Sequence, residues 1–231
     1  MKKFLVATIF IFSLGASAGP SKCDNGNFYK NLLPTDIKFD QELCYSSFNV
    51  LYSYKAKSPV IVGEYLTAER LLQGYHVKRS NDFYAEVSIP LPYRATEKDY
   101  KKSGFDKGHQ APAADAFDDL SKDETFVMSN MVPQTPDLNR RTWRLIEEDV
   151  RDKVIQKNLS AYVLTGPIYS DTVLNIGHGV WVPAYSYKAV SFSDGSKVVY
   201  VATNVRKDSK SFAYSEEEFL ENFKFNPFRQ E

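Results

Sequence analysis

The sequence predicts an α+β fold, because strand-like and helix-like segments are mixed along the chain and strands predominate toward its C-terminus. From residue 139 to 158, apolar residues recur at the spacing of one face of a helix. Two β-rich runs, 180–192 and 197–203, flank the turn Ser193-Asp194-Gly195-Ser196, which predicts two adjacent strands. Together these segments indicate a sheet with helices beside it.

The N-terminal half contains weaker signals. Residues 19–48 have no clear period and predict an irregular lead-in. Residues 58–66 are typical of a strand, and 67–72 of a short helical turn. Residues 83–89 alternate apolar and polar side chains before Pro90 and Pro92, which also predicts a strand. The glycine- and proline-containing stretch 105–115 predicts a loop.

The C-terminal half is more regular. Residues 126–128 predict a short strand, and 161–165 a longer one. Ser215 followed by Glu218 has the spacing of a capping box, which predicts a closing helix. In the helix at 139–158 the apolar stripe is formed by Trp143, Ile146, Val150 and Val154. Arg144 with Glu148, and Glu147 with Arg151, have i,i+4 spacing and predict ion pairs on its wetter face.

The N-terminus predicts a signal peptide over residues 1–18. Lys2 and Lys3 precede an apolar run from Phe4 to Leu14, and Ala16-Ser17-Ala18 has the pattern of a cleavage site. The run is shorter than the about 20 residues needed to span a bilayer, so a retained anchor is the lesser alternative. We therefore expect an exported protein, secreted or periplasmic, without stable membrane association, whose residues 19–231 form a single domain.

Cys23 and Cys44 are the only cysteines in the chain. In an exported protein they predict a structural disulfide. Closing a loop of about 20 residues contributes roughly 3 kcal/mol in the chain-entropy model.

The charge balance excludes a globally basic nucleic-acid binder. The chain has 29 basic and 29 acidic residues, and residues 1–18 hold two lysines and no acid, so their removal leaves a net charge of −2. A local basic groove remains possible. Basic residues do gather on both sides of residues 105–115: Lys98, Lys101, Lys102, Lys107, Arg140, Arg141, Arg144 and Arg151.

The stretch from Phe105 to Asp115 contains Asp106-Lys107-Gly108-His109, with no cysteine or second histidine nearby. This pattern suggests that His109 is a general base rather than a metal ligand, because a neutral imidazole can accept a proton near pH 7. Two polar segments follow, Ser129–Gln134 and Asp137–Glu147. His76 and His178 lack such a context and are interpreted as structural.

This combination resembles the DNA/RNA non-specific endonucleases, the His-Me finger or ββα-metal nucleases, over roughly residues 58–205. The resemblance implies a central antiparallel sheet flanked by helices, with a strand, loop and helix that hold a metal. It implies hydrolysis of DNA and RNA to 5′-phosphate products with Mg²⁺, or with Mn²⁺ or another divalent cation. Contacts mainly to phosphates would make the cleavage independent of base sequence.

Site residues follow from the resemblance position by position. His109 matches the general base, Asn139 the metal ligand and Glu147 the acid that orients the waters of the metal. Asn130 matches a polar residue that supports the site, and Arg79 an upstream phosphate-binding arginine. Asn139 as a helix cap, and Glu147 as a surface partner of Arg151, remain alternatives. Asp106 is interpreted as an orienting acid.

Lys107 departs from the family pattern, which has arginine at this position. Lysine keeps the positive charge but lacks the planar fork of arginine. We expect Lys107, with Arg140 and Arg141, to contact the substrate. Two other functions stay open: a secreted nucleic-acid-binding protein with reduced or lost catalysis, and a disulfide-stabilised surface protein without catalysis.

Overall fold

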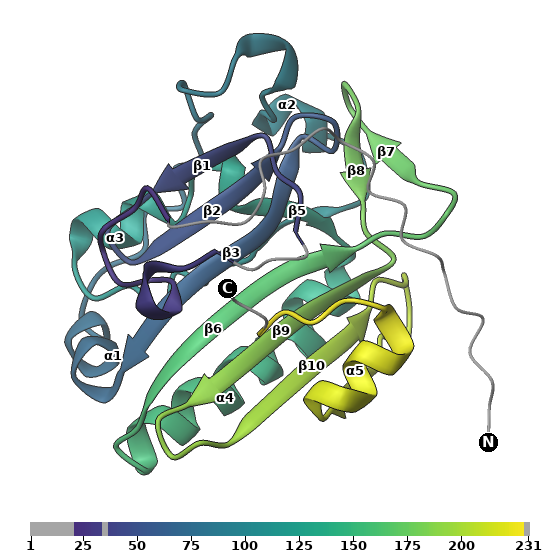
Figure 1. The fold of residues 1–231 in the computed structure, drawn as a ribbon. Helices are drawn as coiled ribbons and strands as arrows, with labels where there is room; N and C mark the ends of the chain where they lie inside the picture. Colours follow the sequence, from purple (N-terminus) through teal and green to yellow (C-terminus); the bar gives the residue numbers. More distant parts are fainter. Residues whose placement is uncertain (1–20, 34–36, 229–231) are drawn as a thin grey trace.

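A seven-stranded antiparallel sheet forms the centre of the protein, and helices lie on both of its faces (Figure 1). The computed structural model describes residues 21–33 and 37–228. In the order of the sheet, the strands are β1 (Gln41–Cys44), β2 (Phe48–Ser53), β3 (Ser58–Thr67), β6 (Ser160–Ile168), β9 (Tyr185–Phe192), β10 (Lys197–Thr203) and β11 (Ser211–Tyr214). The predicted α+β class and the central antiparallel sheet are confirmed.

Two small ribbons accompany the sheet: β4 (Asp106–His109) pairs with β5 (Met131–Gln134), and β7 (Leu174–Ile176) with β8 (Val180–Val182). The helices are α1 (Ala68–Gly74), α2 (Glu97–Tyr100), α3 (Asp119–Glu124), α4 (Arg144–Gln156) and α5 (Glu216–Phe223). A π-helical segment, η4 (Leu138–Trp143), leads directly into α4. Short 3₁₀ turns are η1 (Tyr29–Asn31), η2 (Leu91–Tyr93) and η3 (Met128–Asn130).

The two faces of the sheet are covered by different helices. The predicted stripe of α4 is buried, and Val150 and Val154 pack with Val163 of β6 and Val190 of β9. On the opposite face, Phe219 of α5 joins a second core with Phe28 of the lead-in. Figure 1 shows α4 behind the sheet and α5 in front of it. Because successive side chains of a strand point to opposite faces, each strand contributes residues to a core on both sides of the sheet.

Local signals identify several helix starts. The Thr67 hydroxyl accepts a hydrogen bond from the Arg70 backbone at 3.2 Å and caps α1. Ser215 and Glu218 form the predicted capping box of α5. Each cap satisfies backbone N–H groups that have no partner inside the helix.

Five local predictions are wrong. Residues 83–89 form no strand: only Tyr84 bridges Val127, and the side chain of Val87 is 78% exposed, so the alternation has no face to bury. The lead-in contains β1, and β2 begins at Phe48. The expected loop at 105–115 contains the strand β4. The strand expected at 126–128 is not formed, because β5 begins only at Met131. The run 180–192 is divided between β8 and β9, because Pro183 lacks the N–H needed to continue a ladder.

The Cys23–Cys44 disulfide is present, as predicted, and ties the lead-in to β1. The predicted signal peptide at 1–18 lies outside the described residues. Within 21–33 and 37–228, none of the helices has the length and apolar character required to cross a membrane.

Candidate active site

The ribbon β4–β5 and the helix α4 form a ββα unit at one end of the sheet. His109 pairs with Met131 and Asp106 with Gln134, so the two ends of β4 are fixed by the same partner strand. At Gly108, a Cβ atom would come within 2.3 Å of the Gln134 side chain, so this position in the middle of β4 requires glycine. Because residues 106–109 form a strand, their side chains alternate between the two faces of the ribbon.

His109 is packed against two aromatic rings. Its ring centroid lies 5.1 Å from that of Phe126 and 5.8 Å from that of Phe83. Its Nε2 atom is buried and has no hydrogen-bond partner among the described residues. Burial, assisted by the charges of Arg79 and Lys107, lowers the pKa of His109 to about 3. The imidazole is therefore neutral at pH 7 and can accept a proton.

The predicted cations Arg79 and Lys107 contact the same two rings. The Arg79 guanidinium lies 5.2 Å from the Phe126 ring centroid, and the Lys107 ammonium 3.8 Å from that of Phe83. Lys107 also forms an ion pair with Glu97 at 2.6 Å. The structure thus brings Arg79, Lys107 and His109 together around Phe83 and Phe126. Nothing in the sequence pattern singled out these aromatic residues, because their contact depends on tertiary packing.

Asn139 lies in the π-helical segment η4, a type of irregularity that is frequent at functional sites. Its amide nitrogen donates to Asp106 Oδ2 at 3.0 Å, and Arg140 donates to both carboxylate oxygens of Asp106 at 2.8 Å. Burial opposes ionisation of Asp106, but the bonds from Arg140 and Asn139 outweigh it and hold its pKa below the usual value. Asp106 thus accepts hydrogen bonds from both residues, a geometry compatible with the orienting role interpreted from the sequence.

The two arginines expected at the substrate differ in their surroundings. Arg140 is held in the bidentate pair with Asp106, although 67% of its side chain stays exposed. Arg141 is 80% exposed and lies 3.5 Å from Asp137. Both side chains thus remain accessible, and Arg140 is fixed in position.

Asn130 is completely buried and acts on the backbone. Its side chain exchanges two hydrogen bonds of 2.9 Å with the N–H and C=O of Ala111 and donates to Thr125 O at 2.8 Å. Ala111 is two residues after His109, and Thr125 directly precedes Phe126. Asn130 consequently fixes both the histidine and the ring against which it packs.

Glu147 belongs to a group of charges beneath the site rather than to the wet face of α4. Burial raises the pKa of its carboxyl group to about 7, although the positive charges of Lys188 and Arg151 act in the opposite direction. The predicted pair of Glu147 with Arg151 is not formed as expected, because Arg151 donates to Asp115 at 2.8 Å. Arg144 does pair with Glu148, as predicted.

The resemblance implies a divalent cation, so we ask whether the atoms around Asn139 could bind one. The amide nitrogen of Asn139 is bound to Asp106, which leaves the amide oxygen as the atom that can face a cation. In the described part of the chain, no group of three or more His, Cys, Asp or Glu residues could hold a metal ion. A hard cation that retains most of its waters fits such a sparse oxygen site.

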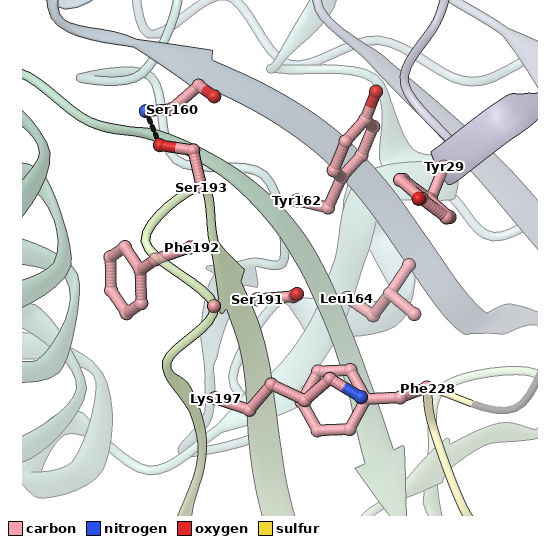
Figure 2. A pocket seen from close by; sticks show the side chains of 10 residues that line it. Tyr29, Ser160, Tyr162, Leu164, Ser191, Phe192, Ser193, Lys197 and Phe228 are labelled. Atoms are coloured by element: carbon pink, nitrogen blue, oxygen red, sulfur yellow. Dashed lines mark hydrogen bonds between the residues drawn. The ribbon is translucent and has the colours of Figure 1, made fainter.

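A hollow of about 500 Å³ lies elsewhere, on the α5 side of the sheet. Figure 2 shows Tyr29 and Tyr162 on one side of it and Lys197 beside Phe228 on another. Among its described lining residues, Lys197 is the charged one, and it is paired with Glu216 at 2.8 Å. The other polar groups of this lining are serine and tyrosine hydroxyls, and none of the predicted site residues belongs to it.

The DNA/RNA non-specific endonuclease family profile matches residues 24–227, nearly the whole chain. The chain belongs to this family. The resemblance to this family is confirmed, and the family is one of metal-dependent nucleases.

Relatives and a solved structure agree with this assignment. A nuclease of Syncephalastrum racemosum is 40% identical over 147 residues, which cover 61% of this chain and 44% of that protein. Endonuclease G, mitochondrial, of Caenorhabditis elegans is 36% identical over 161 residues, 68% of this chain and 50% of that protein. A chain in the crystal structure of the EndoG/EndoGI complex matches with a TM-score of 0.72 and 29% identity, over 83% of this chain and 88% of that one. The chain spans about half the length of the first two relatives.

The expectation of export is corrected by the names of these relatives. The C. elegans protein is named mitochondrial, and so are nucleases of Schizosaccharomyces pombe, Saccharomyces cerevisiae and Homo sapiens. These names contradict the secreted or periplasmic location predicted from residues 1–18. The prediction rested only on the targeting pattern of residues 1–18, and these residues are separate from those that form the fold and the site.

Proposed function

We propose that this protein is a divalent-metal-dependent endonuclease that hydrolyses phosphodiester bonds of DNA and RNA with little sequence preference and leaves 5′-phosphate ends. We also propose that residues 19–231 act as one nuclease domain. The observation that carries the proposal is the arrangement of His109 on β4, with Arg79 and Lys107 against the same aromatic rings and Asn139 on the helical segment that follows β5. Membership in the nuclease family supports the same conclusion.

His109 takes the proton of the attacking water in this proposal. Its depressed pKa keeps it unprotonated, and the neighbouring Arg79 and Lys107 attract the anionic phosphate toward it. Once a phosphate neutralises these two cations, protonation of the imidazole becomes easier, because like-charge repulsion is one of the causes that lower its pKa. Asn130 is a positioning residue, since its bonds are all to backbone groups and Ala111 carries two of them.

Asn139 would hold the cation through its amide oxygen, and we propose Mg²⁺ as that cation. When bound, it supplies positive charge to the scissile phosphate and the leaving oxygen. Asp106 fixes the rotamer of Asn139 by accepting from its amide nitrogen. Glu147 orients water near the site, and Arg140 and Arg141 contact phosphates flanking the cleaved bond.

A second candidate, a nucleic-acid-binding protein with reduced catalysis, is favoured by one contact. Lys107 is paired with Glu97 at 2.6 Å, which offsets part of the charge that a phosphate would meet. Without the fork of an arginine, this position also binds a phosphate less rigidly.

One experiment separates the two candidates. Purified protein is incubated with supercoiled plasmid and with a folded RNA, with Mg²⁺, with Mn²⁺, and with EDTA in excess. We expect nicking and degradation that need the cation and stop with EDTA. We also expect ends that a ligase can join, because ligation needs a 5′-phosphate. Binding without cleavage under every metal condition would contradict the nuclease and favour the binding protein.

A further inference from the structure

Two charged side chains are buried in the apolar face that the sheet presents to α4. Glu64 of β3 and Lys188 of β9 are each 1% exposed. Strand register places them on this face, because Glu64 pairs with Val163 and Lys188 with Thr165 of β6. Lysine and glutamate are almost never fully buried unless they are paired. A burial of this kind in the middle of a core needs a reason.

The contacts of Lys188 reach two parts of the candidate active site. Its ammonium donates to Thr165 Oγ1 at 2.7 Å and to Gln110 O at 3.4 Å, and it lies 3.9 Å from Glu64 Oε2. Gln110 directly follows His109 in the chain. The same ammonium lies 5.7 Å from the ring centroid of Trp143, the last residue of the segment that carries Asn139.

Glu147 connects this pair to the chemistry as well. Lys188 is the largest positive influence on the Glu147 carboxyl group, and it partly offsets the burial that raises the pKa of that group. Asp115 and Arg151 lie close by and form their own ion pair at 2.8 Å. Lys188 therefore touches the backbone beside His109 and also acts on the charge of Glu147.

We propose that Lys188 is a positioning residue of the nuclease site, held by its hydrogen bonds to Thr165 and Gln110, with the buried carboxyl group of Glu64 3.9 Å from its ammonium. This inference rests on the proposed nuclease function. Lys188 acts from beneath: it fixes the chain directly after His109 and supports the π-helical segment that carries Asn139. Because its side chain is buried, it has no contact with substrate, so its loss lowers kcat and leaves KM unchanged.

Four variants test this proposal: Lys188→Met, Glu64→Gln, the double variant of both, and Val201→Ala as a control for lost stability. Val201 is buried on the opposite face of the sheet, with Phe219. The measurements are the thermal unfolding temperature, and kcat and KM on one duplex at fixed salt and saturating Mg²⁺.

We expect Lys188→Met to lower kcat about tenfold or more, with KM within about twofold. It should also lower the unfolding temperature, because it leaves Glu64 buried without its partner. The double variant should regain much of the unfolding temperature, since no unpaired charge remains, while its kcat stays as low as that of Lys188→Met. Glu64→Gln should keep most of its kcat, because Thr165 and Gln110 still hold the lysine. Val201→Ala should lose stability alone.

Recovery of kcat together with stability in the double variant would overturn the proposal and leave a purely structural ion pair. A kcat for Lys188→Met within twofold of wild type would overturn it as well, and the double variant decides the matter if Lys188→Met does not fold. Failure of the proposed function is distinguishable, because the wild-type protein itself would then leave plasmid uncut.

Discussion

The α4 face of the sheet and the α5 face bury different chemistry. On the α5 face, aromatic rings pack against one another: Phe219 lies 4.8 Å from Phe223 and 5.0 Å from Phe225, centroid to centroid. On the α4 face, Glu64 and Lys188 are buried among apolar side chains, and His109 Nε2 has no partner among the described residues. Buried charges and unpaired polar atoms cost stability. We infer that the apolar packing of the α5 face stabilises the fold. This stability allows the α4 face to contain buried polar and charged groups that destabilise it but serve the site.

The largest expected effect of breaking this division is at His109. His109→Ala should lower kcat/KM by about 10²–10⁴-fold, the usual contribution of a general base. His76→Ala is the matched control, because His76 is an exposed histidine outside the motif. Plasmid cleavage by both proteins, each loaded with Mg²⁺, checks the prediction, and wild-type-like turnover by His109→Ala would end the assignment of the base.

The stability of the same variant sharpens the comparison. The pKa of His109 is about 3 in the folded protein and near 6.5 when unfolded. Between these values the unfolded chain binds the extra proton, so the wild type loses stability as the pH falls from about 6.5 toward 3. His109→Ala lacks this loss. Thermal unfolding of wild type and variant across that range should therefore show a smaller acid effect in the variant.

A second large effect is expected at Asn139, on the metal. Asn139→Ala removes the amide oxygen proposed as the direct protein ligand, and the Mg²⁺ concentration for half-maximal cleavage should rise about 100-fold or activity should disappear. Nucleic-acid affinity measured without cleavage should change little. Asn222→Ala, an exposed asparagine on α5 whose amide bonds Glu218 O, is the control. An unchanged Mg²⁺ titration would leave Asn139 with only the helix-start role.

A smaller effect, in the form of a changed pH dependence, is expected at Glu147. Burial raises the pKa of its carboxyl group to about 7, so the active carboxylate forms only as the pH rises through that value. Cleavage by wild type should increase across pH 7, and Glu147→Gln should lose about tenfold in kcat/KM and flatten this rise. Glu148→Gln, the neighbouring acid paired with Arg144, is the matched control and should keep the wild-type profile.

Ionisation of Glu147 should affect stability and activity in opposite directions as the pH rises. Between its unfolded pKa near 4.3 and about 7, folded Glu147 keeps a proton that the unfolded chain has released, so wild-type stability falls as the pH rises through this range. Glu147→Gln should be more stable than wild type at pH 8 and less active. A variant that is both less stable and less active at pH 8 would contradict the burial that defines the α4 face.

Sequence alone could predict the regular parts of both faces. The Trp143–Val154 stripe and the Ser215 capping box depend on spacing within one helix, so they were correct. Strands β4 and β5 were missed because each has only four residues, and they contain Gly108 and Pro133, which are typical of loops. The likeness to a nuclease family is what predicts roles for His109 and Asn139, and both roles stay predictions.

The rest depends on contacts between segments that are far apart in the sequence. Glu64 and Lys188 occupy strand positions that any strand residue could fill, and their pairing across β6 requires the register of three strands. The orientation of Asn139 by Asp106 joins residues 33 positions apart. No spacing within a single segment could predict either contact.

The smallest effect on activity is expected at the disulfide. Cys23 and Cys44 join the lead-in to β1, the edge strand of the sheet, and neither is one of the proposed site residues. The bond closes a loop of 21 residues in sequence separation, and its removal should cost about 3 kcal/mol of unfolding free energy. The Cys23→Ser, Cys44→Ser double variant should therefore unfold at lower denaturant while its kcat/KM, measured well below the transition, stays within about twofold of wild type. Wild type treated with a reductant is the control for the substitution itself. Loss of activity in a fully folded double variant would contradict this prediction. It would mean that regions that stabilise the fold are not separate from those that carry the chemistry, against the comparison of the two faces.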